Sequence, residues 1–277
     1  MFRAVLLLIL STALLPLGDT AGKIIMEGNG VAPEFVAWSR FALGALLLLP
    51  FLGRTLPRRA HVTDWRLWFR SALIAAGITS ILTALKTEPI ANVFGAFFVG
   101  PILSVILSAL ILKETVTWGR ALLLVAGFAG VVLVVRPGFG MTPGLAFACL
   151  AGMFYAAYLV SSRWLADVAP PRTLLLTQLV GGAILTLPFG LTFWPTVTLD
   201  VSLFVIMSAA CSALGNLLLI LAYGRAPASQ LAPFIYFQLV FATIFGAMVF
   251  GEFPDTLTFA GLTLLMASGF ASLALRR

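Results

Sequence analysis

Charged side chains are scarce in this sequence. Asp, Glu, Lys and Arg make up 10% of the 277 residues, whereas 61% of the residues are hydrophobic. A soluble protein has roughly a quarter charged residues and about half apolar residues, so a soluble fold is close to excluded. Disorder is excluded because disordered chains contain few apolar residues. The apolar residues form continuous runs and do not alternate, which argues against a membrane β-barrel. The composition therefore predicts a helical membrane protein with several spans.

Cysteine and histidine are also rare, with two Cys and one His. Cys149 and Cys211 lie in apolar runs, so we interpret them as buried small apolar residues and expect neither a disulfide nor a metal site. His61 lies beside Arg58 and Arg59, where a surface role is expected. A membrane enzyme needs a nucleophile or metal with an activating base, and the sequence offers none at membrane depth. We therefore expect no enzyme and no cofactor.

Ten apolar segments approach the length of about 20 residues that a bilayer-spanning helix needs. The first resembles a signal peptide at its start but continues to Ile25, so we expect it to be retained as a helix. The connections are short and contain most of the Pro, Gly and charged residues. The sequence thus predicts an all-α polytopic membrane protein with ten transmembrane helices, at residues 4–25, 34–52, 67–85, 90–112, 118–135, 143–162, 172–193, 201–222, 228–250 and 256–275.

The distribution of Lys and Arg predicts the orientation, because cytoplasmic loops are enriched in them. With ten spans, both termini lie on the same side. That side is assigned 13 of the 17 basic residues: Arg3, Arg54, Arg58, Arg59, Arg66, Arg70, Lys113, Arg120, Arg163, Arg172, Arg225, Arg276 and Arg277. The other side has Lys23, Lys86 and Arg136, and Arg40 lies within a segment. We expect a multi-pass protein of the cell inner membrane with both termini in the cytoplasm.

The chain resembles itself at an offset of 138 residues. The offset aligns Gly-Ala-Leu-Leu-Leu-Leu-Pro-Phe at 44–51 with Gly-Ala-Ile-Leu-Thr-Leu-Pro-Phe at 182–189, and it also pairs Glu114 with Glu252. We therefore predict two five-helix repeats, residues 1–138 and 139–277. Because five is odd, the second repeat enters the membrane from the opposite face, as in the inverted repeats of secondary transporters. Duplication without transport is the alternative.

The sequence resembles the EamA-type branch of the drug/metabolite transporter superfamily. The resemblance rests on Arg40-Phe41 followed by a leucine-rich run to Pro50, on Pro101 preceding Lys113-Glu114, and on Gly251-Glu252. It covers essentially the whole chain. Two positions depart from the family pattern: Leu17 stands where a tryptophan is common, and Leu239 stands at the repeat equivalent of Pro101.

This resemblance implies a ten-helix carrier with a central cavity. Substrates of the family range over amino acids, nucleotide-linked metabolites, vitamins and drugs. The Asp-x-x-x-Lys pair formed by Asp19 and Lys23 also resembles a subset that handles riboflavin or S-adenosylmethionine.

Asp19, Lys23 and Arg40 are the ionisable residues that we place at membrane depth. Such residues usually face the interior of a helix bundle. One carboxylate does not neutralise two cations, so the surplus charge could bind a solute carboxylate or phosphate, with Arg40 suited to two-point contact. A purely structural ion cluster is the alternative, with Glu27 or Glu34 supplying the missing negative charge. Proton coupling through Asp19 is the less favoured role, because nearby cations keep it ionised.

Polar and aromatic residues at mid-membrane depth could line a cavity. Helix–helix hydrogen bonding is the alternative role for each. With Asp19, Lys23 and Arg40 they form the predicted substrate-binding set: Asn92, Tyr155, Tyr158, Gln178, Asn216, Tyr236 and Gln238. Possible hinges, or positions of close packing, are Gly95, Gly100, Pro101 and Pro233.

We therefore predict a secondary transporter that moves a small polar or ring-bearing metabolite by alternating access between two inverted repeats. The alternatives are a facilitative channel or, more specifically, an uptake carrier for riboflavin or S-adenosylmethionine. The expected partners are the metabolite and the lipid bilayer, with no nucleic acid, and the protein is expected to be a monomer or homodimer. Glycines at 127 and 130, and from 261 to 269, predict packing faces between repeats or between protomers.

Overall fold

The fold is known from a computed structural model that describes residues 2–48, 63–111, 113, 117–136, 140–165, 168–223, 225 and 232–274. Over these residues it contains no strand, and its helices form ten spans. The prediction of an all-α polytopic protein is confirmed. Several predicted features lie outside the described residues: Arg54, Arg58, Arg59, His61, Glu114, Arg276, Arg277 and the segment ends at 49–52, 112, 228–231 and 275.

The first five spans are α1 (Phe2–Gly28), α2 (Pro33–Leu48), α4 (Trp65–Leu85), α5 (Ile90–Phe97) with α6 (Val99–Ile111), and α7 (Trp118–Val135). The other five are α8 (Pro143–Trp164), α9 (Pro171–Thr192), α10 (Leu199–Tyr223), a span made of η2 (Ala232–Tyr236), α12 (Phe237–Phe245) and η3 (Gly246–Phe250), and α13 (Thr256–Ala274). Within the described residues, six helical stretches are individually long and apolar enough to cross a membrane.

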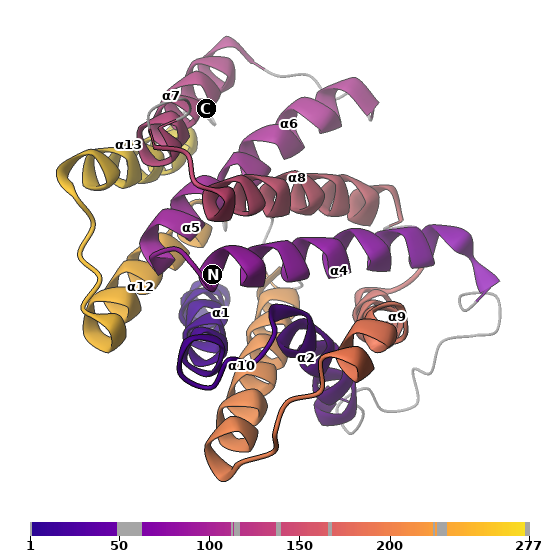
Figure 1. Cartoon of the computed structure of the whole chain (residues 1–277). Helices are drawn as coiled ribbons and strands as arrows, with labels where there is room; N and C mark the ends of the chain where they lie inside the picture. The colour runs from indigo at the N-terminus through magenta and orange to yellow at the C-terminus, as the bar shows by residue number, and fades with distance from the viewer. Residues whose placement is uncertain are drawn as a thin grey trace.

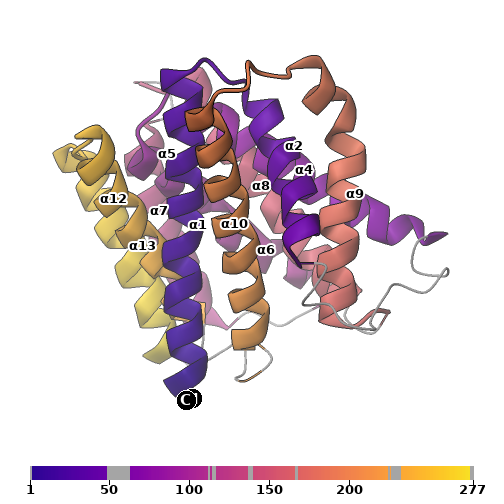
Figure 2. The same ribbon diagram turned by 90° about the horizontal axis from the view of Figure 1, so that it is seen from below.

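Helices from the two halves of the chain pack against each other throughout the bundle. Helix α4 runs along α8 (Figure 1), and the long α1 runs along α10 (Figure 2). In addition, α2 packs on α9 and α7 packs on α13. The start of α1 and the end of α13 lie at one end of the bundle (Figure 2), which we call the terminal face. The turn at 29–32 and the connection at 193–198 lie at the other end, which we call the opposite face. The fold is thus one interlocked bundle.

Glycines allow α7 and α13 to approach closely. A Cβ atom added at Gly130 would lie 2.8 Å from the carbonyl oxygen of Gly261, and one added at Gly261 would lie 2.7 Å from that of Gly130. Both distances are shorter than real Cβ contacts, so neither position accepts a larger residue without movement. The predicted small-residue faces therefore pack against each other within one chain.

The fourth span is interrupted at Phe98, between α5 and α6. Pro101 has no N–H to bond the carbonyl of Phe97, four residues before it. That carbonyl lies against α8, where a Cβ atom at Gly152 would be only 2.6 Å from it. A Cβ atom at Gly100 would likewise lie 2.6 Å from the carbonyl oxygen of Gly152. This predicted hinge region is thus a close contact between helices.

The two remaining hinge candidates lie in different surroundings. A Cβ atom at Gly95 would meet Val134 on α7 at 2.8 Å, so this glycine also marks close packing. Pro233 lies in η2, at the start of the ninth span. Movement at any of these positions stays a prediction.

The contact of α8 with the break in the fourth span gives a test of packing. Gly152→Ala places a methyl group against backbone atoms that cannot rotate away, so we expect a loss of about 1–3 kcal/mol of stability. Gly77→Ala is the matched control, because its Cβ would lie 3.5 Å or more from atoms of the same α8. Thermal unfolding in detergent should show a lower midpoint for Gly152→Ala alone. Equal midpoints would contradict the described contact.

Candidate functional site

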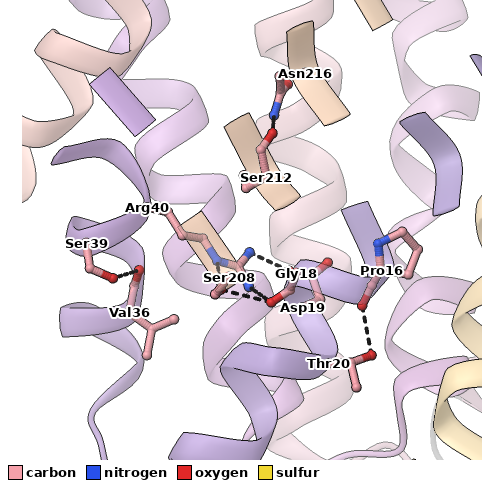
Figure 3. Close-up of polar contacts among 10 residues, drawn as sticks. All are labelled: Pro16, Gly18, Asp19, Thr20, Val36, Ser39, Arg40, Ser208, Ser212 and Asn216. Carbon is pink, nitrogen blue, oxygen red and sulfur yellow. Dashed lines mark hydrogen bonds and ion pairs between the residues drawn. The ribbon is translucent and has the colours of Figure 1, made fainter. Parts of the chain in front are cut away.

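Arg40 joins three helices near the opposite face. Its side chain extends from α2 and forms an ion pair with Asp19 on α1 (Figure 3). Its Nε donates to the hydroxyl of Ser208 on α10 at 2.8 Å, and its Nη2 donates to the carbonyl of Gly18 at 2.8 Å. The Ser208 hydroxyl donates to the same carbonyl at 2.8 Å. Each guanidinium nitrogen thus has a partner, and the pair fastens α1, α2 and α10 together.

The close approach of α1 and α10 makes this network possible. A Cβ atom at Gly18 would lie 3.1 Å from the carbonyl oxygen of Ser208, so the missing side chain lets the helices meet. Arg40 is 5% exposed and Asp19 is 6% exposed. Removing one partner of such a buried ion pair strongly destabilises the folded protein, because the other charge is left without compensation.

Lys23 lies one turn further along α1 and has a different set of partners. It is 1% exposed, and its ammonium contacts a carboxylate oxygen of Glu252 at 2.6 Å and donates to the carbonyl of Glu88 at 2.6 Å. Glu27 lies 3.4 Å away. The second oxygen of Glu252 accepts from the backbone N–H of Ile90 at 2.8 Å, at the start of α5. Lys23 therefore ties α1 to a residue 229 positions away.

The structure separates the three predicted ionisable residues into two sets. Arg40 is matched by Asp19, whereas Lys23 is matched by Glu252 and Glu27. The hypothesis of a bound anion at this end started from one carboxylate serving two cations. The structure places Glu252 beside Lys23, a pairing that the sequence argument did not consider. No positive charge is therefore in surplus among these residues. Solute binding by them stays a prediction.

A second buried arginine lies closer to the terminal face. Arg70 was grouped with the basic residues flanking the spans, but it lies in α4, five residues after its first residue, and is 5% exposed. Its Nη2 donates to the hydroxyl of Tyr158 at 2.7 Å and to the side-chain oxygen of Gln178 at 3.2 Å. Tyr158 also donates to Gln178 at 2.7 Å. Two predicted binding residues therefore meet around an arginine that the sequence argument missed.

Aromatic rings continue from this second network toward the fourth span. Tyr155 is stacked on Tyr158, with ring centroids 5.9 Å apart and planes at 23°. Its other neighbour is Phe97, with centroids 5.1 Å apart. Tyr155 and Tyr158 are both half-buried. This aromatic row could stack on a flat solute.

The other predicted residues lie apart from these networks. Asn216 donates to the carbonyl of Ser212 at 2.8 Å, within α10, which is the structural role (Figure 3). The ring of Tyr236 packs on Phe98, with centroids 5.1 Å apart. Asn92 on α5 and Gln238 on α12 are half-buried, on helices that contact each other. Their roles in binding stay predictions.

The ion pair of Arg40 and Asp19 can be tested by a double-mutant cycle. Arg40→Gln and Asp19→Asn should each lower stability by about 3–5 kcal/mol, because each leaves one buried charge unpaired. The double variant leaves no charge and should recover most of that loss. Thermal unfolding of the purified proteins measures all four states. Strictly additive losses would show that the two side chains do not interact.

Comparisons with known proteins agree with this architecture. The sequence model described as the EamA-like transporter family matches residues 2–136 and again residues 142–273. An S-adenosylmethionine uptake transporter from Rickettsia bellii is 26% identical over 236 residues, covering 83% of this chain and 80% of that protein. A riboflavin transporter from Brucella anthropi is 29% identical over 259 residues, covering 90% and 89%.

A solved crystal structure shows the same fold. It covers 99% of each chain with a TM-score of 0.64, at 22% sequence identity. The family match spans both halves of the sequence, and the named relatives are transporters, not enzymes. This chain is a multi-pass membrane protein that belongs to the EamA-like transporter family.

Proposed function

We propose that this protein is a secondary transporter that works by alternating access between two inverted repeats, residues 1–138 and 139–277. The helix pairing is the observation that carries the proposal. Shifting by 138 residues turns the α1–α10 contact into the α8–α4 contact, and the α2–α10 contact into the α9–α4 contact. The α2–α9 and α7–α13 contacts turn into themselves. This is the pattern that two equivalent five-helix units related by a twofold axis would give.

Two further observations support the repeats. The family model matches the chain twice, with the matches separated at residues 137–141. Each match contains five spans, so equivalent helices of the two halves run in opposite directions across the bundle. Such a construction gives two conformations of similar energy, each open to one side of the membrane, and secondary transporters commonly use it.

Near the opposite face, charged bonds connect the halves. Lys23 is bound to Glu252 across this division, and at the surface Arg136 is paired with Asp255. The Arg136 guanidinium holds the pKa of the Asp255 carboxyl well below its usual range. In an alternating-access cycle, opening at this face breaks bonds of this kind. The other basic residues that the sequence assigns to the side of the terminal face outnumber those assigned to the opposite side. This excess supports an inner-membrane protein with both termini in the cytoplasm.

The solute class follows from the aromatic row and from the relatives. Tyr155, Tyr158 and Phe97 offer ring faces beside the polar side chain of Gln178. The relatives are named for S-adenosylmethionine and riboflavin, which both contain aromatic rings. We therefore propose a small, polar, ring-bearing metabolite as the solute.

Transport by reconstituted protein tests this proposal. Proteoliposomes preloaded with unlabelled S-adenosylmethionine, or with riboflavin, should take up the labelled compound faster than unloaded vesicles. A carrier with solute on both sides of the membrane exchanges the unlabelled molecules inside for labelled molecules outside. Uptake should saturate with concentration. Protein-free liposomes are the control. Flux that rises linearly without accelerated exchange indicates a channel, and the absence of saturable flux across amino acids, nucleotides and vitamins would contradict a carrier.

A further inference from the structure

Arg70 is a buried cation whose described partners are all neutral. Its Nε donates to the hydroxyl of Ser162 at 2.8 Å, and its Nη1 donates to the carbonyl of Leu174 at 3.0 Å. Its Nη2 bonds Tyr158 and Gln178, and its guanidinium carbon lies 4.5 Å from the centre of the Tyr158 ring. None of the ion pairs between described residues includes Arg70. Buried charges in membrane proteins are normally matched, so this site has an unmatched positive charge in the described part of the chain.

The 138-residue offset relates this network to the one around Arg40. Residue 208, the equivalent of Arg70, is Ser208, and residue 178, the equivalent of Arg40, is Gln178. The Arg40–Ser208 bond of 2.8 Å and the Arg70–Gln178 bond of 3.2 Å thus join the same two positions of the repeat. Both arginines belong to the first half of the chain. In one network the arginine occupies the first of these positions (Arg40), and in the other network it occupies the second (Arg70).

The two networks differ in their carboxylate. Asp19 on α1 balances Arg40, but the equivalent position on α8 is Ala157. The second network therefore also contains an arginine, but Ala157 stands where the first network has the counter-ion of its arginine. A carboxylate or phosphate of a solute has the charge and the oxygen geometry to take the missing place, because a guanidinium binds such groups through two parallel N–H bonds.

We propose that Arg70, with Tyr158 and Gln178, binds the anionic oxygens of the transported solute in the half of the bundle near the terminal face. The inference rests on the proposed transport function and adds the charge of the solute and the place where it binds. The oxygens of Gln178 and Leu174 occupy the arginine in the present conformation. A solute anion replaces them, while its ring stacks on the neighbouring Tyr155–Tyr158 pair.

Matched ligand pairs test this site by equilibrium binding to the purified protein. The phosphate arm compares riboflavin 5′-phosphate with riboflavin, and the carboxylate arm compares S-adenosylmethionine with its methyl ester. At least one member with the free phosphate or carboxylate should bind the wild type more tightly than the partner that lacks this anionic group. The words anionic and neutral refer below to this group alone, because S-adenosylmethionine and its ester both carry positive charges elsewhere. Arg70→Gln should weaken the binding of that anion by about 10- to 100-fold, since hydrogen bonds to charged groups contribute about 1.5–3 kcal/mol. Its affinity for the neutral partner should stay the same.

Arg66→Gln is the matched control, because it removes the same charge one turn away on α4. Arg66 is 34% exposed and paired with Asp64, so its loss should leave all affinities unchanged. A further contrast is stability without ligand. Arg70→Gln leaves no described carboxylate unpaired, so its unfolding midpoint should not fall as that of Arg40→Gln does.

Two more variants examine the counter-charge itself. Ala157→Asp supplies a carboxylate at the position equivalent to Asp19 and should abolish the preference for the anion. If it fails to fold, the Arg70→Gln comparison decides. Asp167 lies outside the described residues, and Asp167→Asn should leave the anion affinity unchanged. Tighter anion binding by Asp167→Asn would mean that the chain itself neutralises Arg70 and would overturn the proposal.

The proposal is also wrong if no anionic probe binds the wild type better than its neutral partner, or if Arg70→Gln keeps the preference. These results are distinct from a failure of the transport proposal. Counterflow by the wild type together with an unchanged preference in Arg70→Gln would remove only the anion site. Absence of saturable flux would remove the carrier mechanism on which the site depends.

Discussion

A charge buried within a membrane protein must be matched, and this requirement organises the interior of this one. The protein has few charged residues, yet Lys23, Arg40 and Arg70 are each at most 5% exposed. Lys23 and Arg40 are matched by carboxylates on other elements. Near the opposite face, the Lys23–Glu252 ion pair and the Arg40–Ser208 hydrogen bond join the two halves. Among the described residues, all hydrogen-bond partners of Arg70 are neutral. To the glycine and apolar contacts of the helices, these charges add specific bonds between segments far apart in sequence.

In our proposal the two halves arose by duplication, and their later divergence accounts for the difference between the two arginine networks. The same pair of repeat positions is hydrogen-bonded in both networks, as Arg40–Ser208 and as Gln178–Arg70, and each bond joins one half of the chain to the other. Only the first retains a carboxylate within the described chain. An inverted pair of identical sites would present the same chemistry to both sides of the membrane. In our proposal, this difference gives the Arg40 network a structural role between helices, whereas Arg70 binds a charged solute.

The sequence predicted the helical content, the ten spans and the class of membrane protein, because these depend on local apolar content and on segment length. Most described helices begin and end within a few residues of the predicted segments. It also identified Asp19 and Arg40, whose similar depth follows from their positions in neighbouring helices. The partner of Lys23 was not predictable in this way: Glu252 is distant in sequence, and only the tertiary fold brings it to α1. Arg70 was missed because it lies near the start of a span, although its equivalence to Ser208 was available from the repeat.

The central claim is that the two halves insert in opposite directions, and labelling of equivalent positions tests it most directly. Thr87 and Arg225 are exposed, lie between equivalent helices, and are 138 residues apart. Each is changed to cysteine in a chain whose Cys149 and Cys211 are replaced by alanine. A membrane-impermeant maleimide applied to intact cells should label the cysteine at 87, whereas the cysteine at 225 should react only after permeabilisation. Labelling of both positions from the same side would contradict the inverted arrangement.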